Sequence, residues 1–492
     1  MGNRQLETLS FDNTYARLPA AFYAKLNPTP FRSSPYLVSM NPAAAELIDL
    51  NPDEAKRPEF AALFGGSMLA PGMDPLAMLY SGHQFGVYVP QLGDGRAILL
   101  GEATNARGER WDLHLKGAGT TPFSRDGDGR AVLRSTIREY LCSEAMHALG
   151  IPTTRALCIV GSDEKVYREQ VETGAMLLRM AASHVRFGSF EILYYRKQHE
   201  LLKVLADFVI ENHFVHLREV AEKYALFFAE VAERTAKLIA RWQAVGWAHG
   251  VMNTDNMSIL GLTLDYGPFG FMDDYDAGFI CNHSDHNGRY AFNQQPYIGL
   301  WNLSCLAQAL LPLAEKEALK AGLDAYTPVF EREYRAFMRA KLGLSEDRRE
   351  DDELIREFLS LLQETHADYT ILFRELGAFR ADQGMMINEP LREHFMDRDR
   401  FDAWALRYRS RLHSEGSRDD ERQRAMNRVN PKYVLRNYLA QNAIEQAQQK
   451  DFAEVDRLLT LLQRPYSEQP GMERYAAPPP NWGKHLSVSC SS

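Results

Sequence analysis

The chain has 492 residues, of which 45% are hydrophobic and 25% are charged, a composition typical of a globular protein with a large core. It carries 56 Lys and Arg against 65 Asp and Glu, and this net charge of -9 argues against a nucleic-acid binder that neutralises phosphates. It contains no apolar run of about 18 residues, which argues against a membrane-spanning helix.

Five cysteines, at positions 142, 158, 281, 305 and 490, form neither a dense disulfide framework nor paired CxxC motifs for zinc. The first residues lack the apolar core of a secretory signal. We therefore expect a cytoplasmic protein with mostly reduced thiols and no membrane partner. The oligomeric state cannot be read from the sequence.

The first part of the chain is rich in predicted strands. Residues 87–89, 97–102 and 111–116 are apolar or alternating, and turns that contain glycine separate them. A glycine-rich segment over 117–129 then leads to a helix predicted over 131–149, which has an apolar stripe.

Beyond residue 195 the pattern is helical. Apolar residues at spacings of three and four predict helices over 201–215 and 217–245, and Gly246 is a suitable end for the second. A short β segment is expected over 257–264. Further helices are expected over 300–321, 328–341, 352–366 and 433–449.

This order predicts an α/β chain with a two-lobed, protein-kinase-like fold. Residues 1–80 form an N-terminal extension, 81–190 a strand-rich small lobe with the nucleotide loop, and 191–464 a mostly helical large lobe. The tail over 465–492, which contains Cys490, is rich in Pro, Ser and Gly and is expected to be flexible.

The segment 249–256, with the sequence His-Gly-Val-Met-Asn-Thr-Asp-Asn, resembles the catalytic loop of a protein kinase. Kinases place a base Asp two residues after the loop His and a metal-binding Asn five residues after that Asp. Asn256 stands at the metal position, but the base position holds Val251, which cannot accept a proton. A carboxylate reappears at Asp255, beside the Asn.

Asp265 begins an Asp-Tyr-Gly sequence nine residues after Asn256. Its carboxylate and the Asn256 side-chain oxygen could ligate Mg²⁺ together with a triphosphate. The metal ligands therefore look intact while the usual base is lost. This combination predicts a kinase fold that performs different chemistry on a nucleotide.

Lys116 ends a strand in which Trp111, Leu113 and Leu115 share one face and the polar residues share the other, which indicates a half-buried strand. Its expected partner is Glu139 on the following helix, with Glu144 as a rival. Taken alone, Lys116 would be a solvated lysine, and only its place between the glycine turn and the helix favours a nucleotide role.

Gly93, Gly95 and Arg96 form a turn whose amides could approach an anion, although a plain hairpin turn is the more common meaning. Arg179 and Arg186 are seven residues apart, about two turns if that segment is helical. They could then grasp phosphate oxygens together, whereas solvated or structurally paired arginines are the default alternative.

Together these residues resemble the selenoprotein O family of protein adenylyltransferases, called YdiU in bacteria. The resemblance covers nearly the whole chain and includes the segments 249–258, 265–273 and 430–438. It implies a kinase-like fold in which ATP lies flipped, so that the α-phosphate faces the attacking hydroxyl. AMP is then transferred to protein Ser, Thr or Tyr, and pyrophosphate leaves.

The resemblance also implies residue roles. Asp255 becomes the proton acceptor, and Asn256 and Asp265 hold Mg²⁺ or Mn²⁺. Transfer of UMP from UTP with manganese is also ascribed to the family. Protein targets with redox roles are the expected partners. Contacts with the nucleotide are implied for Gly93, Gly95, Arg96, Lys116, Asp128, Gly129, Arg179, Arg186 and Asp265.

Cys490 occupies the place where some family members carry selenocysteine. A bond to Cys281, in the segment that corresponds to an activation loop, would restrain that loop and make activity redox-dependent. Two unconnected thiols are the alternative. The segment 281–286 also suggests zinc, but no second ligand cluster follows it.

Two other functions stay open at this point. One is a kinase of a protein or small molecule in which Asp255 replaces the lost base. The other is a non-catalytic pseudokinase that binds ATP as a structural ligand.

Overall fold

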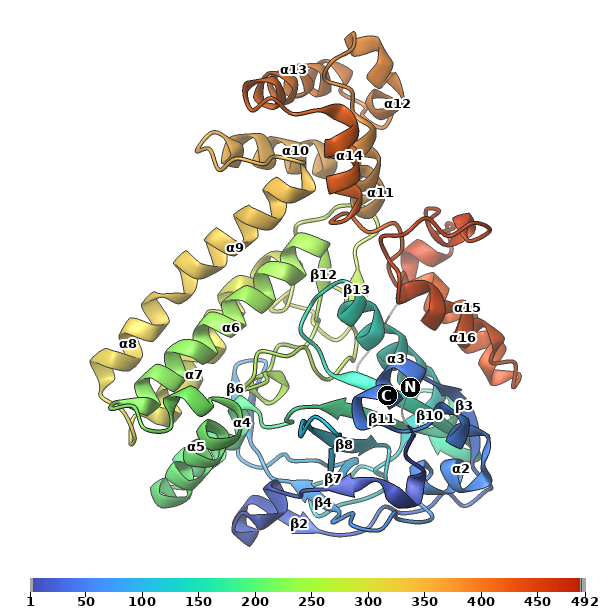
Figure 1. The fold of residues 1–492 in the computed structure, drawn as a ribbon, viewed down its shortest axis with the longest axis vertical. Coiled ribbons are helices and arrows are strands. Elements are labelled where there is room, and N and C mark those ends of the chain that lie inside the picture. The colour runs from blue at the N-terminus through green and yellow to red at the C-terminus, as the bar shows by residue number, and fades with distance from the viewer. Residues whose placement is uncertain (1–2, 487, 489–492) are drawn as a thin grey trace.

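The computed structural model describes residues 3–486 and 488, and a nine-stranded antiparallel sheet forms its lower end in Figure 1. The main strand order is β2-β4-β7-β8-β11-β10-β3, while β1 pairs with β7 and β9 pairs with β11. The strands are β1 Ser10–Phe11, β2 Tyr23–Lys25, β3 Tyr36–Met40, β4 Leu76–Met78, β5 Gly82–Gln84, β6 Val87–Val89, β7 Ala97–Thr104, β8 Arg110–Lys116, β9 Ala131–Val132, β10 Arg155–Tyr167, β11 Val171–Ala181, β12 Trp247–Ala248 and β13 Gly270–Phe271.

The predicted strands over 97–102 and 111–116 form the β7–β8 hairpin, with Ala97 opposite Lys116 and Thr104 opposite Arg110. The prediction of a half-buried β8 was wrong, because both of its faces are buried. Leu113 and Leu115 pack against a core that the N-terminal segment completes, and the polar face points toward α3.

The described part of the N-terminal extension, residues 3–80, supplies β1, β2, β3 and β4 to this sheet. Apolar side chains of α1 and α2, such as Ala44, Phe60 and Phe64, cover the Leu113 face. The segment predicted over 87–89 is β6, which pairs only with β5, in a separate hairpin. Phe85 and Gly86, at the turn of this hairpin, both have positive φ, as a tight two-residue turn requires.

The helices are α1 Pro42–Ala45, α2 Pro58–Phe64, α3 Leu133–Ala148, α4 Phe187–Tyr195, α5 His199–His213, α6 Lys223–Val245, α7 Gln295–Leu310, α8 Lys316–Asp324, α9 Tyr326–Lys341, α10 Asp351–Thr365, α11 Tyr369–Glu375, α12 Glu389–Arg392, α13 Arg398–Ser414, α14 Asp419–Asn427, α15 Asn437–Gln448 and α16 Ala453–Leu462. The predicted helices over 131–149, 201–215 and 217–245 correspond to α3, α5 and α6. Gly246 ends α6, as predicted, and it adopts the left-handed conformation there.

Two further predictions of local structure were wrong. The helix expected over 300–321 is divided into α7 and α8 by a turn at 311–315. The β segment expected over 257–264 makes only isolated bridges, from Ser258 to Arg186 and from Thr263 to Thr153. The chain bends at Gly261, whose φ is positive, so the segment cannot lie along a neighbouring strand.

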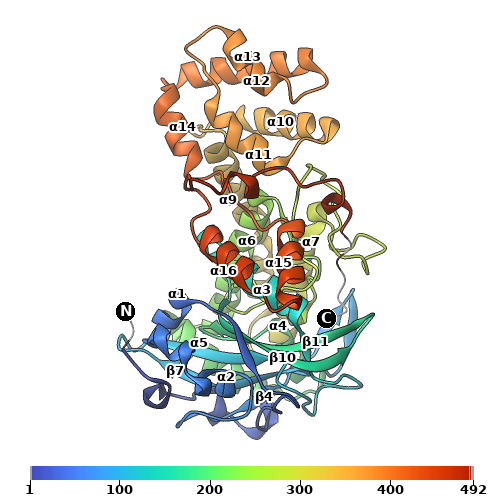
Figure 2. The same ribbon diagram turned by 90° about the vertical axis from the view of Figure 1, so that its right-hand side faces the viewer.

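The helices beyond the sheet form three groups. Helices α4–α9 pack together on the left of Figure 1. Helices α10–α14 surround a second core at the top of Figure 1, to which Ala244 of α6 and Met338 of α9 also contribute. Helices α15 and α16 return to the sheet and pack against α3 (Figure 2). In the tail the structure describes only short 3-10 turns, and Tyr475 is buried there against Glu454. No helix in the described part of the chain combines the length and the apolar character needed to cross a bilayer.

Candidate functional site

A cavity of about 410 Å³ lies where the β7–β8 end of the sheet meets the segment 251–268. Its walls carry more cationic than acidic side chains, which suits a polyphosphate. It brings together every residue predicted to bind the nucleotide, hold the metal or accept the proton: Gly93, Gly95, Arg96, Lys116, Asp128, Gly129, Arg179, Arg186, Asp255, Asn256 and Asp265.

Two glycines of the cavity wall are required by close backbone contacts. A Cβ on Gly95 would lie 2.8 Å from the Phe123 carbonyl oxygen, and one on Gly129 would lie 2.1 Å from the Gly119 carbonyl carbon. Gly129 also has a φ of 71°, which favours glycine. The turn before β7 and the segment 119–129 therefore pack directly against each other.

Two charged residues of this wall differ in their partners. Asp128 forms an ion pair with Arg168 over 2.8 Å, and the hydrogen bond from Arg168 lowers the pKa of Asp128. The Arg96 side chain makes no hydrogen bond or ion pair with any residue in the described ranges, and burial lowers its pKa. Its guanidinium, which stays charged, is therefore available to an anion.

The predicted Lys116–Glu139 ion pair is present and buried. Burial lowers the pKa of Lys116, and the Glu139 carboxylate opposes that shift. The rival Glu144 instead forms a two-pronged pair with Arg155, with both contacts at 2.7 Å. Glu139 therefore fixes the Lys116 ammonium at the cavity wall.

Arg179 and Arg186 meet at Asp265, but they do not lie on one helix, which was the condition under which their spacing would place them on one face. Arg179 lies on β11, and Arg186 immediately precedes α4. Arg179 Nη1 is 2.6 Å from Asp265 Oδ1, and Arg186 pairs with the other carboxylate oxygen. Burial alone would raise the pKa of Asp265, but the two guanidiniums hold it well below its usual range.

His114 holds Arg179 from the other side. Arg179 Nη2 donates to His114 Nδ1 over 2.9 Å, and His114 Nε2 contacts Asp94 Oδ2 at 3.0 Å. Burial lowers the pKa of His114 to about 4, so the ring is neutral at pH 7 and can accept this hydrogen bond. The polar face of β8 thus positions both Lys116 and Arg179.

Asn256 and Asp265 suit a hard divalent cation. The Asn256 amide donates to Asp265 Oδ2 over 3.1 Å, so the two side chains are already in contact. Asp265 is ionised, and both residues offer oxygen ligands of the kind that Mg²⁺ and Mn²⁺ prefer. Asp265 adopts a left-handed backbone, with φ of 61°, which is uncommon for a residue other than glycine.

Asp255 lies in a 3-10 turn, Thr254–Asn256, and has a partly unsatisfied carboxylate. Its Oδ1 is buried and has no hydrogen-bond partner among the described residues, while Oδ2 accepts a bond from Gln84 over 3.1 Å. Burial raises its pKa to about 7. A carboxylate with that pKa can exchange a proton with a ligand near neutral pH.

The sequence pattern of the SelO family, described as "Protein adenylyltransferase SelO", matches residues 5–463. The chain belongs to this family. It is 62% identical over 487 residues to a protein of Myxococcus xanthus named "Protein nucleotidyltransferase YdiU", a match that covers 99% of each chain. Proteins with the same name from Thioalkalivibrio sulfidiphilus and Thiobacillus denitrificans are each 58% identical, and the matches cover at least 99% of each chain.

In this SelO-family chain, sequence reasoning missed the residues of β5 that contact the Asp255 carboxylate. Gln84 and Gly82 belong to β5, and a Cβ on Gly82 would lie 2.4 Å from Asp255 Oδ1. The hairpin is also tied to the segment 249–256 through His83 N, which donates to Thr254 Oγ1 over 2.7 Å. No spacing rule connects these segments, so the sequence offered no signal for them.

His249, the loop histidine of the motif, has a structural position in this SelO-family site. Burial lowers its pKa, its Nε2 donates to the Leu264 carbonyl over 3.0 Å, and its Nδ1 accepts from Val251 N at 3.3 Å. The ring therefore ties the segment that carries Asp255 to the residue before Asp265.

The proposed redox pair lies partly outside the described residues, because Cys490 is not among them. Cys281 is buried, and its Sγ contacts the Ala248 carbonyl at 3.5 Å. His283 N donates to the Val488 carbonyl over 2.9 Å, so the tail passes beside the loop of Cys281. Within the described ranges, Cys281, His283 and His286 do not form a three-ligand metal cluster.

Proposed function

We propose that this chain transfers AMP from ATP to hydroxyl groups of proteins. The single observation that carries the proposal is the buried Asp255 carboxylate, with one unbonded oxygen, beside the Asn256–Asp265 pair in a cationic cavity. The family to which the chain belongs, and the name of its relatives as protein nucleotidyltransferases, support the same activity.

The phosphates would bind where the cationic side chains converge. Lys116, Arg179 and Arg186 offer charged donors, and Arg96 adds a guanidinium without a protein partner in the described structure. Arg179 and Arg186 would pass from Asp265 to phosphate oxygens as the nucleotide arrives. A divalent cation held by Asn256 and Asp265, when bound, neutralises charge on the phosphates.

Asp255 would take the proton of a Ser, Thr or Tyr hydroxyl. The hydroxyl oxygen then attacks the α-phosphorus, and the bond from that phosphorus to the bridging oxygen breaks, so pyrophosphate leaves. Val251 at the usual kinase base position cannot take part. The proposal places the α-phosphorus near Asp255, with ATP flipped relative to its orientation in kinases, as the family resemblance implies.

The proposal includes a two-lobed, kinase-like arrangement. The small lobe is residues 81–190 and the large lobe is 191–464, with 1–80 as an extension and 465–492 as a tail. The large antiparallel sheet and the helices that follow it support this division. Cytoplasmic location, target proteins with redox roles and a Cys281–Cys490 bond that restrains the loop are part of the same proposal.

Labelled nucleotide separates the candidate reactions. Label on the α-phosphate of ATP that appears in protein supports AMP transfer, whereas γ-label in the product supports a kinase. Nucleotide binding without any covalent product supports a pseudokinase. Intact-protein mass spectrometry with ATP or UTP, and with Mg²⁺ or Mn²⁺, identifies the transferred group, since AMP adds about 329 Da.

A further inference from the structure

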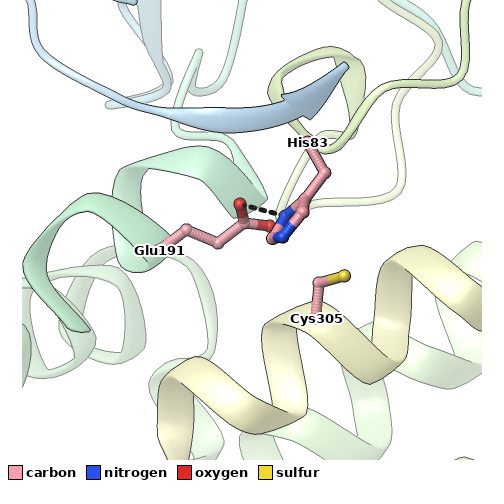
Figure 3. A group of neighbouring side chains, drawn as sticks. All are labelled: His83, Glu191 and Cys305. Atoms are coloured by element: carbon pink, nitrogen blue, oxygen red, sulfur yellow. Dashed lines mark hydrogen bonds and ion pairs between the residues drawn. The ribbon is translucent and has the colours of Figure 1, made fainter. Parts of the chain in front are cut away.

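Three side chains with metal-binding atoms converge outside the nucleotide cavity (Figure 3). His83 lies on β5, Glu191 on α4 and Cys305 on α7, and their ligand atoms all lie within 4.8 Å of one another. His83 Nδ1 is 2.9 Å from Glu191 Oε2, and Cys305 rises from α7 toward this pair. Three elements that are distant in sequence thus supply one ligand each.

The Glu191 carboxylate is incompletely satisfied. Its side chain is 0% exposed, and within the described residues Oε1 has no hydrogen-bond partner. No lysine or arginine in the described ranges forms an ion pair with it. A buried carboxylate oxygen without a donor is unfavourable, and a bound cation would supply the missing partner.

The donor set identifies the class of cation. A thiol, an imidazole and a carboxylate are ligands of Zn²⁺, whereas Mg²⁺ and Ca²⁺ prefer oxygen atoms alone. Ligand atoms around a tetrahedral Zn²⁺ lie roughly 3.3–3.8 Å apart, so small side-chain movements would bring these three into place. We propose that His83, Glu191 and Cys305 bind one Zn²⁺-like cation, separate from the cation of Asn256 and Asp265.

The surroundings hold the ligands in place. The His83 ring packs against Tyr88, Tyr195 and Trp301, with ring centroids 5.2, 5.9 and 5.4 Å away. A cation that binds the Cys305 thiolate must displace the thiol proton.

The cation would clamp the β5–β6 hairpin to α4 and α7. His83 N already donates to Thr254, and the next residue, Gln84, donates to Asp255. The clamp thereby fixes the backbone that orients Gln84. This inference concerns metal binding and does not depend on the transfer reaction.

Cobalt is a direct probe of the site. After metal is removed with a chelator, titration with Co²⁺ should produce a thiolate-to-cobalt charge-transfer band that saturates at one equivalent and disappears when Zn²⁺ is added. Cys305→Ser and Cys305→Ala should lose the band. His83→Ala and Glu191→Gln should weaken Co²⁺ binding by at least about tenfold.

Two control variants test whether the charge-transfer band comes from Cys305. Cys490→Ser removes another thiol, and Asp265→Asn removes a ligand of the other cation, so both should keep the band. Zn²⁺ should also slow amide exchange over 82–89 in the unmodified chain but not in Cys305→Ser. The proposal is overturned if the band is missing, if it persists in folded Cys305→Ser, or if Zn²⁺ leaves amide exchange over 82–89 unchanged. Near-ultraviolet circular dichroism shows whether each variant is folded.

Discussion

Gln84 donates a hydrogen bond to Asp255 over 3.1 Å, although 171 positions separate the two residues in the sequence. This bond favours the ionised carboxylate, whereas burial favours the protonated form. The balance leaves the pKa of Asp255 at about 7. The β5 strand therefore sets the protonation of the proposed base.

The rate of AMP transfer should rise with pH through about 7 and then level, because only ionised Asp255 can take the proton. Gln84→Ala removes a donor to the carboxylate, so the pKa of Asp255 and the midpoint of the profile should move to higher pH. Gln91→Ala, an exposed Gln that contacts Arg196, is the matched control. The measurement is the single-turnover rate against pH, and an unchanged midpoint in Gln84→Ala contradicts the prediction.

Asp255→Asn should reduce the transfer rate by about 10²- to 10⁴-fold while making the fold more stable at pH 8. Because burial raises the pKa of Asp255 from 3.8 to about 7, its contribution to stability is fully present below pH 4 and is lost as pH rises through 7. Asn cannot ionise, so the stability difference should grow from pH 4 to 7 and then stay constant. Denaturant unfolding at several pH values measures this difference. If the stability of Asp255→Asn and of the unmodified chain depended equally on pH, the pKa of Asp255 would not be raised by burial.

Glu139→Gln should destabilise the fold by about 3 kcal/mol and raise the KM for nucleotide, because Lys116 and Arg179 both lose their shared carboxylate. Glu144→Gln is a closely matched control. It breaks an equally buried pair with Arg155, so it should destabilise the fold without changing the nucleotide KM. Equal KM effects in the two variants would show that Glu139 acts on stability alone.

Gly82→Ala should lower the transfer rate strongly and the melting temperature only slightly. The added Cβ would lie 2.4 Å from Asp255 Oδ1 and push the carboxylate aside. Gly384→Ala, where a Cβ meets nothing within 4 Å, should be neutral. The rate constant and the melting temperature of each variant check this. A Gly82→Ala protein with normal transfer would mean that the carboxylate position is not critical.

Asp265→Asn should abolish metal-dependent transfer but strengthen metal-free binding of ATP or pyrophosphate. Arg179 and Arg186 lose the anion that now neutralises them, so phosphate oxygens become their best partners. The shift in melting temperature on adding pyrophosphate with a chelator should therefore be larger than in the unmodified chain. A smaller shift would indicate that Asp265 assists anion binding.

The sequence predicted the centre of the site because its parts lie close together in the chain. Asn256 and Asp265 are nine residues apart, and the Lys116–Glu139 pair follows from a strand leading into a helix. Tertiary contacts account for what was missed. Arg179 and Arg186 meet because a strand end and a helix start converge, which their spacing alone does not reveal.

The misread elements have a similar cause. Ile259 and Leu264 are buried and apolar, as in a strand. The segment makes only separate backbone bonds, such as Ile259 N to the Val185 carbonyl, and isolated bridges in place of a continuous strand pair. The polar face of β8 looked solvent-exposed in the alternating pattern. It is buried because Asp112, His114 and Lys116 each have a buried polar partner.

The first 80 residues supply β2 and β3, the strands at the two ends of the main sheet path. A chain that began at residue 81 would leave β7 and β10 with unpaired backbone N–H and C=O groups, which are templates for pairing with other molecules. Deletion of this segment should therefore produce aggregates. The N-terminal strands therefore prevent self-association through the sheet edges, in addition to completing the core.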